Sequence, residues 1–468
     1  MNYRYKFSLT AFVLMLFLSS CSDYLDINDN PNVATEPPID GLLASSTYNT
    51  AQNTYAIGAS VSFYTQYLAS PNEGGTLDTY EEPDFSGIYS AAYQAMADIY
   101  DMRLLAVEQG ASHHEAVGNL LMAYHLMFLT DLFGSAPYSQ ALDGSDITPV
   151  WDSGESLYAE ANALVDQAIT LFGDAEPGRL LSANSDLIHD GDVAAWIRTC
   201  YALKARLANH LSKTSDYDPT AVLAAVDQAY TSNDQDMQMS SFPLRNPWAQ
   251  VAVNNSNLLL GGWLSDQIIS HMNGNTYGVF DPRLPLITDT TVFGDYRGTE
   301  NGAGRAGDGT QAEECYLVTS GYYSSEDAPV LLLTYAEMKF IEAEAAMSGG
   351  DMGRAYTAYL EGIRANMEKV GVDMASIDAY LADPAVGVGQ GNLTMDLIFK
   401  EKYTAMFLNP ETWNDARRHD YGYQGFDLPI GANLSEFVRL VTVPEVATAR
   451  NGENTPNTTL TDRVFWDQ

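Results

Sequence analysis

The stretch LTYAEMKFIEAEAAMSGGDMGRAYTAYLEGIRANMEKVG, residues 333–371, decides the fold of this chain. Apolar and small residues recur at helical spacing after Thr334, and Gly349-Gly350 then interrupts the pattern. Asp351 is a good N-cap for a second helical segment, which ends at Gly371. Two helices joined by so short a turn pack against each other, so the stretch predicts a helix hairpin.

The predicted hairpin resembles a structural repeat. A tetratricopeptide unit contains about 34 residues in two helices. The stretch is similar to such a unit in length and in its small residues, which are Ala343, Ala345, Ala346 and Ala355. No exact second copy is recognisable, so the sequence predicts a degenerate array of hairpins.

More helices are predicted on the N-terminal side of this hairpin. Apolar residues form one stripe over 117–128 and another over 157–172, as in amphipathic helices that pack against neighbours. The pattern continues over 196–211, and the segment 219–230 opens with a proline in its first turn. Helical periods dominate from residue 91 onward, so the predicted fold class is all-α.

The segment from Phe242 to Pro329 differs from the rest of the chain. It is rich in glycine, asparagine, aspartate and aromatic residues and shows little helical periodicity. Long irregular segments in compact proteins are usually functional, and binding residues collect on loops that a rigid scaffold holds. We therefore expect an irregular lobe over about 242–330 within one helical body, residues 41–468.

The first 31 residues indicate export. Arg4 and Lys6 precede an apolar run over 7–18 that is too short to span a bilayer, which is typical of a secretory signal. Leu18-Ser19-Ser20-Cys21 resembles a bacterial lipobox, in which the cysteine is acylated after cleavage. The sequence thus predicts a signal peptide over 1–20, a lipidated Cys21 and a polar tether over 21–40; the alternative is an ordinary signal with a chance cysteine.

The composition excludes one class of partner. The formal net charge is −38, and the signal peptide contains two basic and no acidic residues, so the mature chain is more acidic still. Such a surface repels phosphate backbones, which excludes nucleic acid. Cys200 lies in a helical run and Cys315 in a strand-like run; we expect buried thiols, although a disulfide between them stays open.

Several patterns that suggest catalysis or metal binding fail on their spacing or context. His113-His114-Glu115 lacks the i, i+4 spacing of helical metal ligands and is interpreted as a solvated helix start. Glu342 and Glu344 point to different helix faces, unlike the carboxylate pair of a glycosidase. The glycines of 302–307 lack a strand and helix around them, and 26–37 lacks the glycine and glutamate of a calcium loop. No catalytic residue, metal or cofactor is predicted; whether a calcium ion binds stays open.

Five segments in the right order resemble the SusD/RagB family of outer-membrane nutrient-binding lipoproteins. They are the lipobox with CSDYLDINDNPN, the segment TDLFGSAPYSQA at 130–141, DPRLP at 281–285, LTYAEMKFIEAEA at 333–345, and Trp413, Asn414, Asp415, Arg417 and Arg418. The late family signature keeps Arg439 and Pro444, but Val443 stands in place of its tyrosine. That departure suggests a divergent branch of the family.

The resemblance implies a fold, a place and a partner. The fold would be four tetratricopeptide-like hairpins in a right-handed superhelix, with the irregular lobe carrying the ligand surface. The protein would be lipid-anchored on the cell exterior and would cover a SusC-like TonB-dependent barrel as a lid. Its ligands would be oligosaccharides, bound without catalysis. A peptide receptor of the same family and a surface hydrolase are the alternatives.

Sugar binding needs exposed aromatic faces together with amides and carboxylates for the hydroxyl groups. Two stretches, 64–89 and 263–296, contain such residues in clusters, although large aromatics more often serve burial. The candidate ligand-binding residues are Tyr67, Asn72, Asp78, Tyr80, Phe85, Trp263, Asn275, Tyr277 and Tyr296. We hypothesise that Tyr80, Phe85, Trp263 and Tyr277 share one exposed platform.

Overall fold

The computed structural model describes residues 37–257, 262–306 and 313–468, and this part of the chain is mainly helical. The predicted signal peptide, Cys21 and most of the predicted tether lie outside the described residues. The helices are α2 (Ile39–Val61), α3 (Ser86–Gln109), α4 (Ser112–Phe133), α5 (Gly154–Phe172), α6 (Val193–His210), α7 (Pro219–Val226), α8 (Pro247–Ser256), α9 (Asp266–Met272), α10 (Tyr335–Ser348), α11 (Met352–Val370), α12 (Met374–Ala382), α13 (Met395–Ala405), α14 (Glu411–Arg418) and α15 (Glu445–Asn451).

The described strands are short and form three separate antiparallel pairs. They are β1 (Leu68–Ala69) with β5 (Trp263–Leu264), β2 (Ser135–Ala136) with β3 (Asp152–Ser153), and β4 (Met237–Met239) with β6 (Val330–Leu333). Short 3-10 turns cover Leu211–Lys213, Asn233–Gln235, Leu284–Leu286 and Gln390–Asn392. The predicted all-α fold of tetratricopeptide-like hairpins is confirmed.

The hairpin predicted from residues 333–371 is α10 and α11, and its ends form as their residues dictate. Thr334 and Glu337 make a reciprocal capping box at the start of α10. At its end, the Asp351 N–H donates to the Ala346 carbonyl and the Gly350 N–H donates to the Met347 carbonyl, at 2.8 and 3.0 Å. This is a Schellman motif, and Gly350 occupies its left-handed position with φ of 84°.

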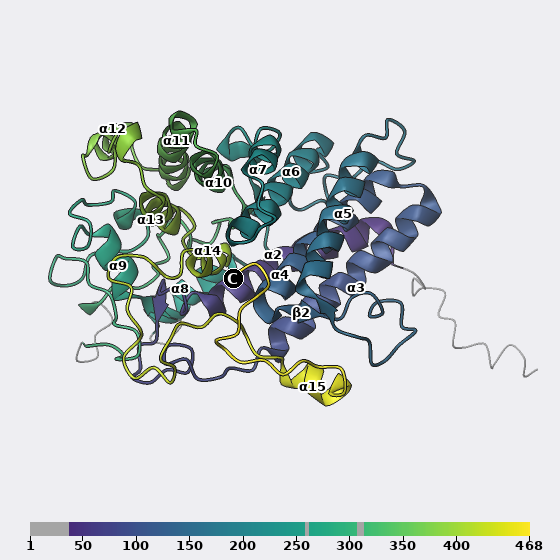
Figure 1. Cartoon of the computed structure of the whole chain (residues 1–468), viewed down its shortest axis with the longest axis horizontal. Coiled ribbons are helices and arrows are strands. Elements are labelled where there is room, and N and C mark those ends of the chain that lie inside the picture. Colours follow the sequence, from purple (N-terminus) through teal and green to yellow (C-terminus); the bar gives the residue numbers. More distant parts are fainter. Residues whose placement is uncertain (1–36, 258–261, 307–312) are drawn as a thin grey trace, which may run out of the picture.

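The helices follow one another in space as they do in sequence. Figure 1 shows α5, α6, α7, α10, α11 and α12 in this order along the top of the molecule, from right to left, with α3 and α4 below α5. Helix α3 packs on α4, α4 on α5 and α10 on α11. The four alanines singled out in the predicted hairpin are all fully buried. A side chain added at Gly362 on α11 would meet the Phe340 ring of α10 at 3.0 Å, so small residues permit the close approach.

Helix α2 was not predicted, and its polar residues explain why. Ser46, Thr47, Thr50 and Thr54 are buried along its length and interrupt the apolar pattern. The Thr50 and Thr54 hydroxyls donate to carbonyls four residues earlier, at 2.7 and 2.8 Å. Buried hydroxyls that bond within the helix satisfy their polarity, so α2 can pack against α3 and α4 without an apolar stripe.

Helix α4 forms the middle of the core. Among the described residues it alone is long and apolar enough to cross a membrane, with a mean hydropathy of 1.3. Its apolar window is completely buried by neighbouring helices. The composition is therefore that of a core helix.

The irregular lobe contains more helix than predicted. Helices α8 and α9 lie within it, but most of the described part of residues 242–329 is turns and extended segments. Figure 1 shows the lobe, with α8 and α9, at the end of the molecule opposite α3 and α5. The hairpin scaffold thus holds the lobe at one end.

Candidate functional site

The two stretches predicted to bind ligand lie side by side. Strand β1 follows α2 and pairs with β5 of the lobe, so Leu68 faces Leu264 and Ala69 faces Trp263. The Arg305 N–H donates to the Pro71 carbonyl at 3.1 Å, which extends the contact. Residues about 200 positions apart in sequence therefore form one surface.

The predicted aromatic platform is wrong for most of its members, because their rings are buried. Three of its four members, Tyr80, Phe85 and Trp263, are each at most 4 % exposed, and the candidate binding residue Tyr67 is fully buried as well. The Tyr67 hydroxyl donates to the Tyr403 carbonyl and lies 3.0 Å from Thr412 Oγ1. The Trp263 ring contacts the Arg305 guanidinium, which lies 4.4 Å from the ring centroid, and also the Tyr316 ring. Tyr67 is thus bonded to α13 and α14, and Trp263 packs within the lobe.

Asp78 is also buried, and its carboxylate joins the two stretches. It accepts hydrogen bonds from the Ser70 N–H and from Asn301 Nδ2, both at 2.6 Å, and from the Gly302 N–H at 3.1 Å. Burial raises the pKa of Asp78, and these three donors offset part of the rise. The carboxylate thus fixes the 70–80 loop against the lobe and is not exposed to a ligand.

Four of the predicted site residues reach the surface. Asn72 and Asn275 are exposed, and Tyr277 and Tyr296 are half-buried. The Tyr296 ring contacts the Phe280 ring, with centroids 6.0 Å apart, and Phe280 is 46 % exposed. Phe293 is 58 % exposed and lies in the same turn region as Tyr296. We call Phe280, Phe293 and Tyr296 the aromatic patch.

A polar cleft of about 180 Å³ lies at the other end of α9, and we call it the lobe cleft. Its lining combines the start of α9 with Gln66 and with the loop that follows α14. The lining residues are Gln66, Ser265, Asp266, Gln267, Glu300, Asn301, Gly425, Asp427, Leu428, Pro429 and Ile430. The cleft therefore has carboxylate acceptors and no basic side chain.

Hydrogen bonds through Gln424 connect the lobe cleft with Tyr277, and the cleft also contains one strained residue. The Gln267 amide donates to the Gln424 carbonyl at 3.2 Å, and the Gln424 N–H donates to the Tyr277 hydroxyl at 3.3 Å. Gln66 has a positive φ of 50°, which is strained for a residue other than glycine and is common at functional sites. The loop 424–430 thus borders both the cleft and the region that leads to the aromatic patch.

Sequence reasoning missed Phe280, Phe293 and the loop 424–430. Phe280 was available as an aromatic residue directly before the Asp281-Pro282 turn. The loop gave no signal of its own, because its place beside α9 depends on contacts between segments about 160 residues apart. Such contacts cannot be read from local periodicity.

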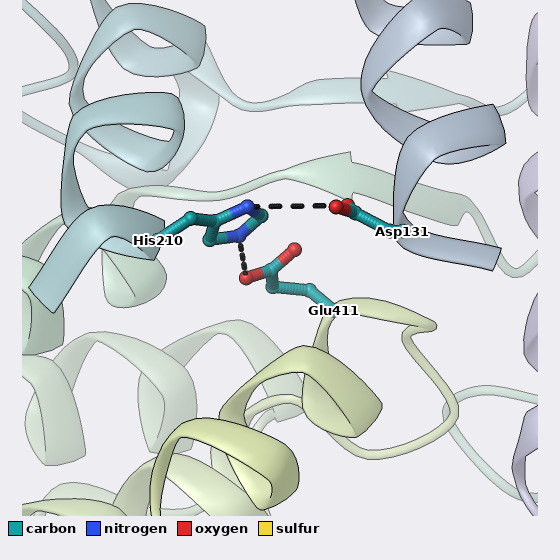
Figure 2. Close-up of side chains that lie close together, drawn as sticks. All are labelled: Asp131, His210 and Glu411. Carbon is teal, nitrogen blue, oxygen red and sulfur yellow. Dashed lines mark hydrogen bonds and ion pairs between the residues drawn. The ribbon is translucent and has the colours of Figure 1, made fainter. Parts of the chain in front are cut away.

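The one described cluster with the composition of a metal site is Asp131, His210 and Glu411 (Figure 2). His210 Nε2 lies 2.6 Å from Glu411 Oε1, and Nδ1 lies 2.7 Å from the Tyr158 hydroxyl. The other carboxylate oxygens accept hydrogen bonds from Tyr158, Trp466 and Asn414. Every ligand atom is already engaged inside the core, so the arrangement fits a hydrogen-bond network and not a metal centre.

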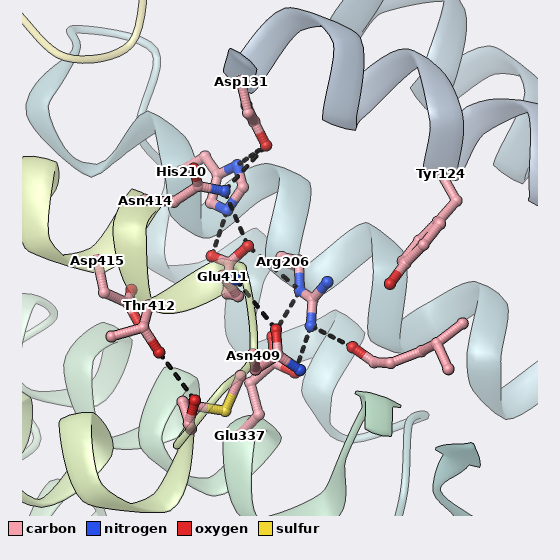
Figure 3. Close-up of polar contacts among 12 residues, drawn as sticks. Tyr124, Asp131, Arg206, His210, Glu337, Asn409, Glu411, Thr412, Asn414 and Asp415 are labelled. Atoms are coloured by element: carbon pink, nitrogen blue, oxygen red, sulfur yellow. Dashed lines mark hydrogen bonds and ion pairs between the residues drawn. The ribbon is translucent and has the colours of Figure 1, made fainter. Parts of the chain in front are cut away.

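The network continues through Arg206, as Figure 3 shows. Arg206 donates to both oxygens of Glu337 at 2.6 Å and lies 3.7 Å from Glu411. Burial alone would raise the pKa of Glu411, but the charges of His210 and Arg206 outweigh it and hold the pKa well below its usual range. Helices α4, α6, α10 and α14 thus meet at one buried set of charges.

The segments that resemble the family serve this buried charge network and its neighbours. Asp131 belongs to the 130–141 segment, and Glu337 belongs to the 333–345 segment. Arg283 of the 281–285 segment donates to Asp281 and, at 3.0 Å, to Glu401 of α13, which attaches the lobe to the scaffold. Arg418 similarly pairs with Glu344 of α10 at 2.8 Å. The resemblance therefore rests on residues that hold the fold.

Other sequence predictions have mixed outcomes. The interpretation of His113-His114 as solvated is wrong: His114 is fully buried and lies 3.5 Å from Asp40, because α2 covers the start of α4. Glu342 and Glu344 do point apart, toward Arg354 and toward Lys402. Cys200 and Cys315 are separate buried thiols.

Comparison with known proteins agrees with this architecture. The sequence profile of the SusD-like family, described as "Starch-binding associating with outer membrane", matches residues 31–436. A chitin-binding SusD homolog from Flavobacterium johnsoniae superposes with a TM-score of 0.77 at 22% identity, over 92% of this chain and 98% of its own. A SusD homolog from Bacteroides fragilis gives 0.77 at 20% identity over 92% and 100%, and one from Parabacteroides distasonis gives 0.78 at 19% over 92% and 98%.

No curated protein sequence matches the chain. Identities this low show a shared fold alone, but the family profile spans most of the chain from residue 31 onward. The resemblance drawn from its sequence segments is confirmed, and this chain belongs to the SusD-like family.

Proposed function

We propose that this chain is a lipoprotein of the outer cell surface that binds nutrient oligosaccharides and delivers them, unchanged, to a SusC-like TonB-dependent barrel. The observation that carries the proposal is the exposed aromatic patch on the same lobe as the acceptor-rich lobe cleft. The family description and the chitin-binding relative support a glycan ligand. The anchor on Cys21 and the barrel partner rest on the sequence resemblance.

The chemistry of the lobe suits a sugar. The apolar face of a pyranose ring packs on an aromatic ring, and Phe280 and Tyr296 offer two rings in contact. Sugar hydroxyls are donors, and Glu300 and Asp427 in the cleft offer carboxylate acceptors. Helix α9 is seven residues, or about 10 Å, long, so one oligosaccharide of a few rings can reach from the cleft to the patch.

The cluster of Asp131, His210 and Glu411 and the two cysteine thiols lie out of reach of a polymer. The described cluster of Asp131, His210 and Glu411 is buried between helices. Burial raises the pKa of the Cys315 thiol to about 11 and raises the pKa of the Cys200 thiol further, so neither thiol is activated. These features support binding without turnover.

Calorimetry with chitohexaose and maltohexaose tests the proposal. Phe280→Ala and Tyr296→Ala should each weaken binding by about 2 kcal/mol or more if the patch is central, with little change in melting temperature. Asp427→Asn should weaken binding through the cleft. Leu104→Ala, at a residue of α3 that is 54 % exposed, is the matched control and should bind as the unaltered chain does.

Three outcomes would contradict the proposal. Normal binding by all of the lobe variants would remove the site from the lobe. Binding of peptides without binding of glycans would favour a peptide receptor. Formation of product, abolished by a point substitution, would favour a hydrolase.

A further inference from the structure

A second pocket lies outside the lobe, between α3, α15 and the segment that follows β2, and we call it the α3–α15 pocket. Figure 1 labels α3, α15 and β2. Its volume is about 430 Å³, more than twice that of the lobe cleft, and lies in the range of small-ligand sites. Its lining residues are Tyr89, Ser90, Tyr93, Gln94, Ala97, Pro137, Ala141, Ile147, Pro149, Val446, Ala447, Arg450 and Asn451.

The walls of this pocket are held in place by hydrogen bonds. The Tyr93 hydroxyl donates to the Pro137 carbonyl at 2.6 Å, and Asn451 Nδ2 donates to the Pro149 carbonyl at 2.6 Å. The Tyr89 ring stacks on Trp151 with centroids 6.3 Å apart, and it contacts the Tyr93 ring at 4.6 Å. The two bonds join α3 and α15 to the same segment, so the pocket is built into the fold.

Helix α3 lines the pocket with aromatic and polar groups in two rows. Tyr89 and Tyr93 lie four residues apart, and so do Ser90 and Gln94, so each pair shares a helix face. Gln94 is exposed, and its amide can both donate and accept. Aromatic rings beside an amide and a hydroxyl are the groups that bind a sugar ring.

The charge of the pocket is opposite to that of the molecule. Arg450 is the one charged residue among those lining the pocket, in a chain with 61 acidic and 23 basic residues. Arg450 forms no ion pair with any residue that the structure describes, whereas most other arginines do. A guanidinium without an ion pair can bind a carboxylate through two hydrogen bonds. At physiological salt, repulsion from acidic residues more than about 8 Å away is largely screened, so the acidic surface does not prevent an anionic ligand from binding here.

We propose that the α3–α15 pocket binds a hexuronic acid residue of an acidic glycan. The sugar ring packs against Tyr89 and Tyr93, its hydroxyls bond to Ser90 and Gln94, and its carboxylate pairs with Arg450. The glycan class rests on the proposed function, but the pocket is separate from the lobe, so an acidic chain would have a second point of attachment. A ligand held at two points binds more tightly than at either one.

The test uses trigalacturonate and its trimethyl ester, which has the same rings without the charges. By calorimetry, Arg450→Gln should weaken trigalacturonate binding about tenfold or more, as expected for the loss of one charge-assisted hydrogen bond. The ester should bind equally to both proteins. The control is Arg364→Gln. Arg364 of α11 forms an exposed ion pair with Asp378 of α12, so this substitution removes an equal charge far from the pocket lining and should leave the affinities for trigalacturonate and for its ester unchanged.

Fluorescence locates the bound sugar, because Trp151 stacks on Tyr89. Trigalacturonate should change the fluorescence of the unaltered chain, and Trp151→Phe should remove that change while calorimetric binding persists. No binding of trigalacturonate, or an unchanged affinity of Arg450→Gln, would overturn the proposal. Tighter binding of a peptide with a C-terminal carboxylate, lost in Arg450→Gln, would assign the pocket to peptides instead.

The proposed function and this inference fail separately. Neutral chitohexaose should bind normally to Arg450→Gln and weakly to Phe280→Ala. If the unaltered chain bound no neutral glycan, the proposed function would be contradicted. If the affinity for trigalacturonate did not depend on Arg450, only the assignment of the α3–α15 pocket would be contradicted.

Discussion

At the scale of single residues, the buried charges determine what the fold tolerates. Arg206 neutralises Glu337 and lies beside Glu411 with no exposure to solvent. Arg206→Met would leave the buried Glu337 carboxylate without its cation and would remove one of the two cations beside Glu411, so it should reduce the free energy of unfolding by about 3–5 kcal/mol. The measurement is urea unfolding at neutral pH.

Arg364→Met is the control for that experiment. Its ion pair with Asp378 is largely exposed, so the expected loss is about 0–1 kcal/mol. Similar losses in the two variants would contradict the importance of the buried network.

A buried histidine makes stability depend on pH. His125 donates from Nδ1 to the Leu121 carbonyl at 2.8 Å, and Asn53 Nδ2 donates to Nε2 at 3.3 Å, so the ring is neutral in the fold. Burial lowers the pKa of His125 to about 4. The unfolded chain, with a histidine pKa near 6.5, takes up the proton first, so this contribution is present above about pH 6.5 and is lost as the pH falls toward 4.

His125→Gln removes this titration and keeps a neutral polar side chain. The free energy of unfolding should fall less between pH 7 and pH 4.5 in the variant than in the unaltered chain, by about 2–3 kcal/mol. Burial also lowers the pKa of His271, to about 3, and raises that of Asp236, to about 6, but both are common to the two proteins. Equal pH slopes would contradict the assignment.

At the scale of elements, the turn of the α10–α11 hairpin offers a test with opposite signs. Gly350 has a φ of 84°, so Gly350→Ala should cost about 1 kcal/mol of unfolding free energy, and Gly350→Val should cost more. Gly353 is the second residue of α11, and the nearest atom to an added Cβ is 3.6 Å away. Gly353→Ala should therefore stabilise the protein by about 0.5–1 kcal/mol. Urea unfolding that gave both substitutions the same sign would place the turn elsewhere.

The sequence predicted elements well where local signals agree. Capping residues, glycine stops and helical period coincide over 333–371, and the structure has the hairpin there. Prediction failed for α2, where buried threonines hide the period. The sequence also predicted exposed rings for Tyr80 and Trp263, which are buried. An aromatic residue in a loop-like segment has the same local sequence pattern whether or not another segment covers it. The site depends on that coverage, which is a tertiary property.

At the scale of the whole molecule, the proposed lipid anchor on Cys21 would determine where the protein works. If Cys21 carries the only lipid, Cys21→Ala should be exported but released as soluble periplasmic protein, because no other strong membrane attachment is predicted. Fractionation followed by blotting measures this. Cys315→Ala, at a buried thiol, should stay with the outer membrane. A Cys21→Ala protein that still fractionates with the outer membrane would refute the lipobox interpretation.

The position of Trp466 and Asp467 has a consequence for the timing of biogenesis. Both side chains are fully buried; Trp466 donates to Asp131 at 3.0 Å, and Asp467 pairs with Arg439 at 2.6 Å. The buried charge network is therefore incomplete until the segment with these two residues has been made, so we expect a chain without that segment to fold incompletely. A chain truncated before Trp466 should be exported normally yet be degraded by proteases after export, which pulse-chase labelling would detect.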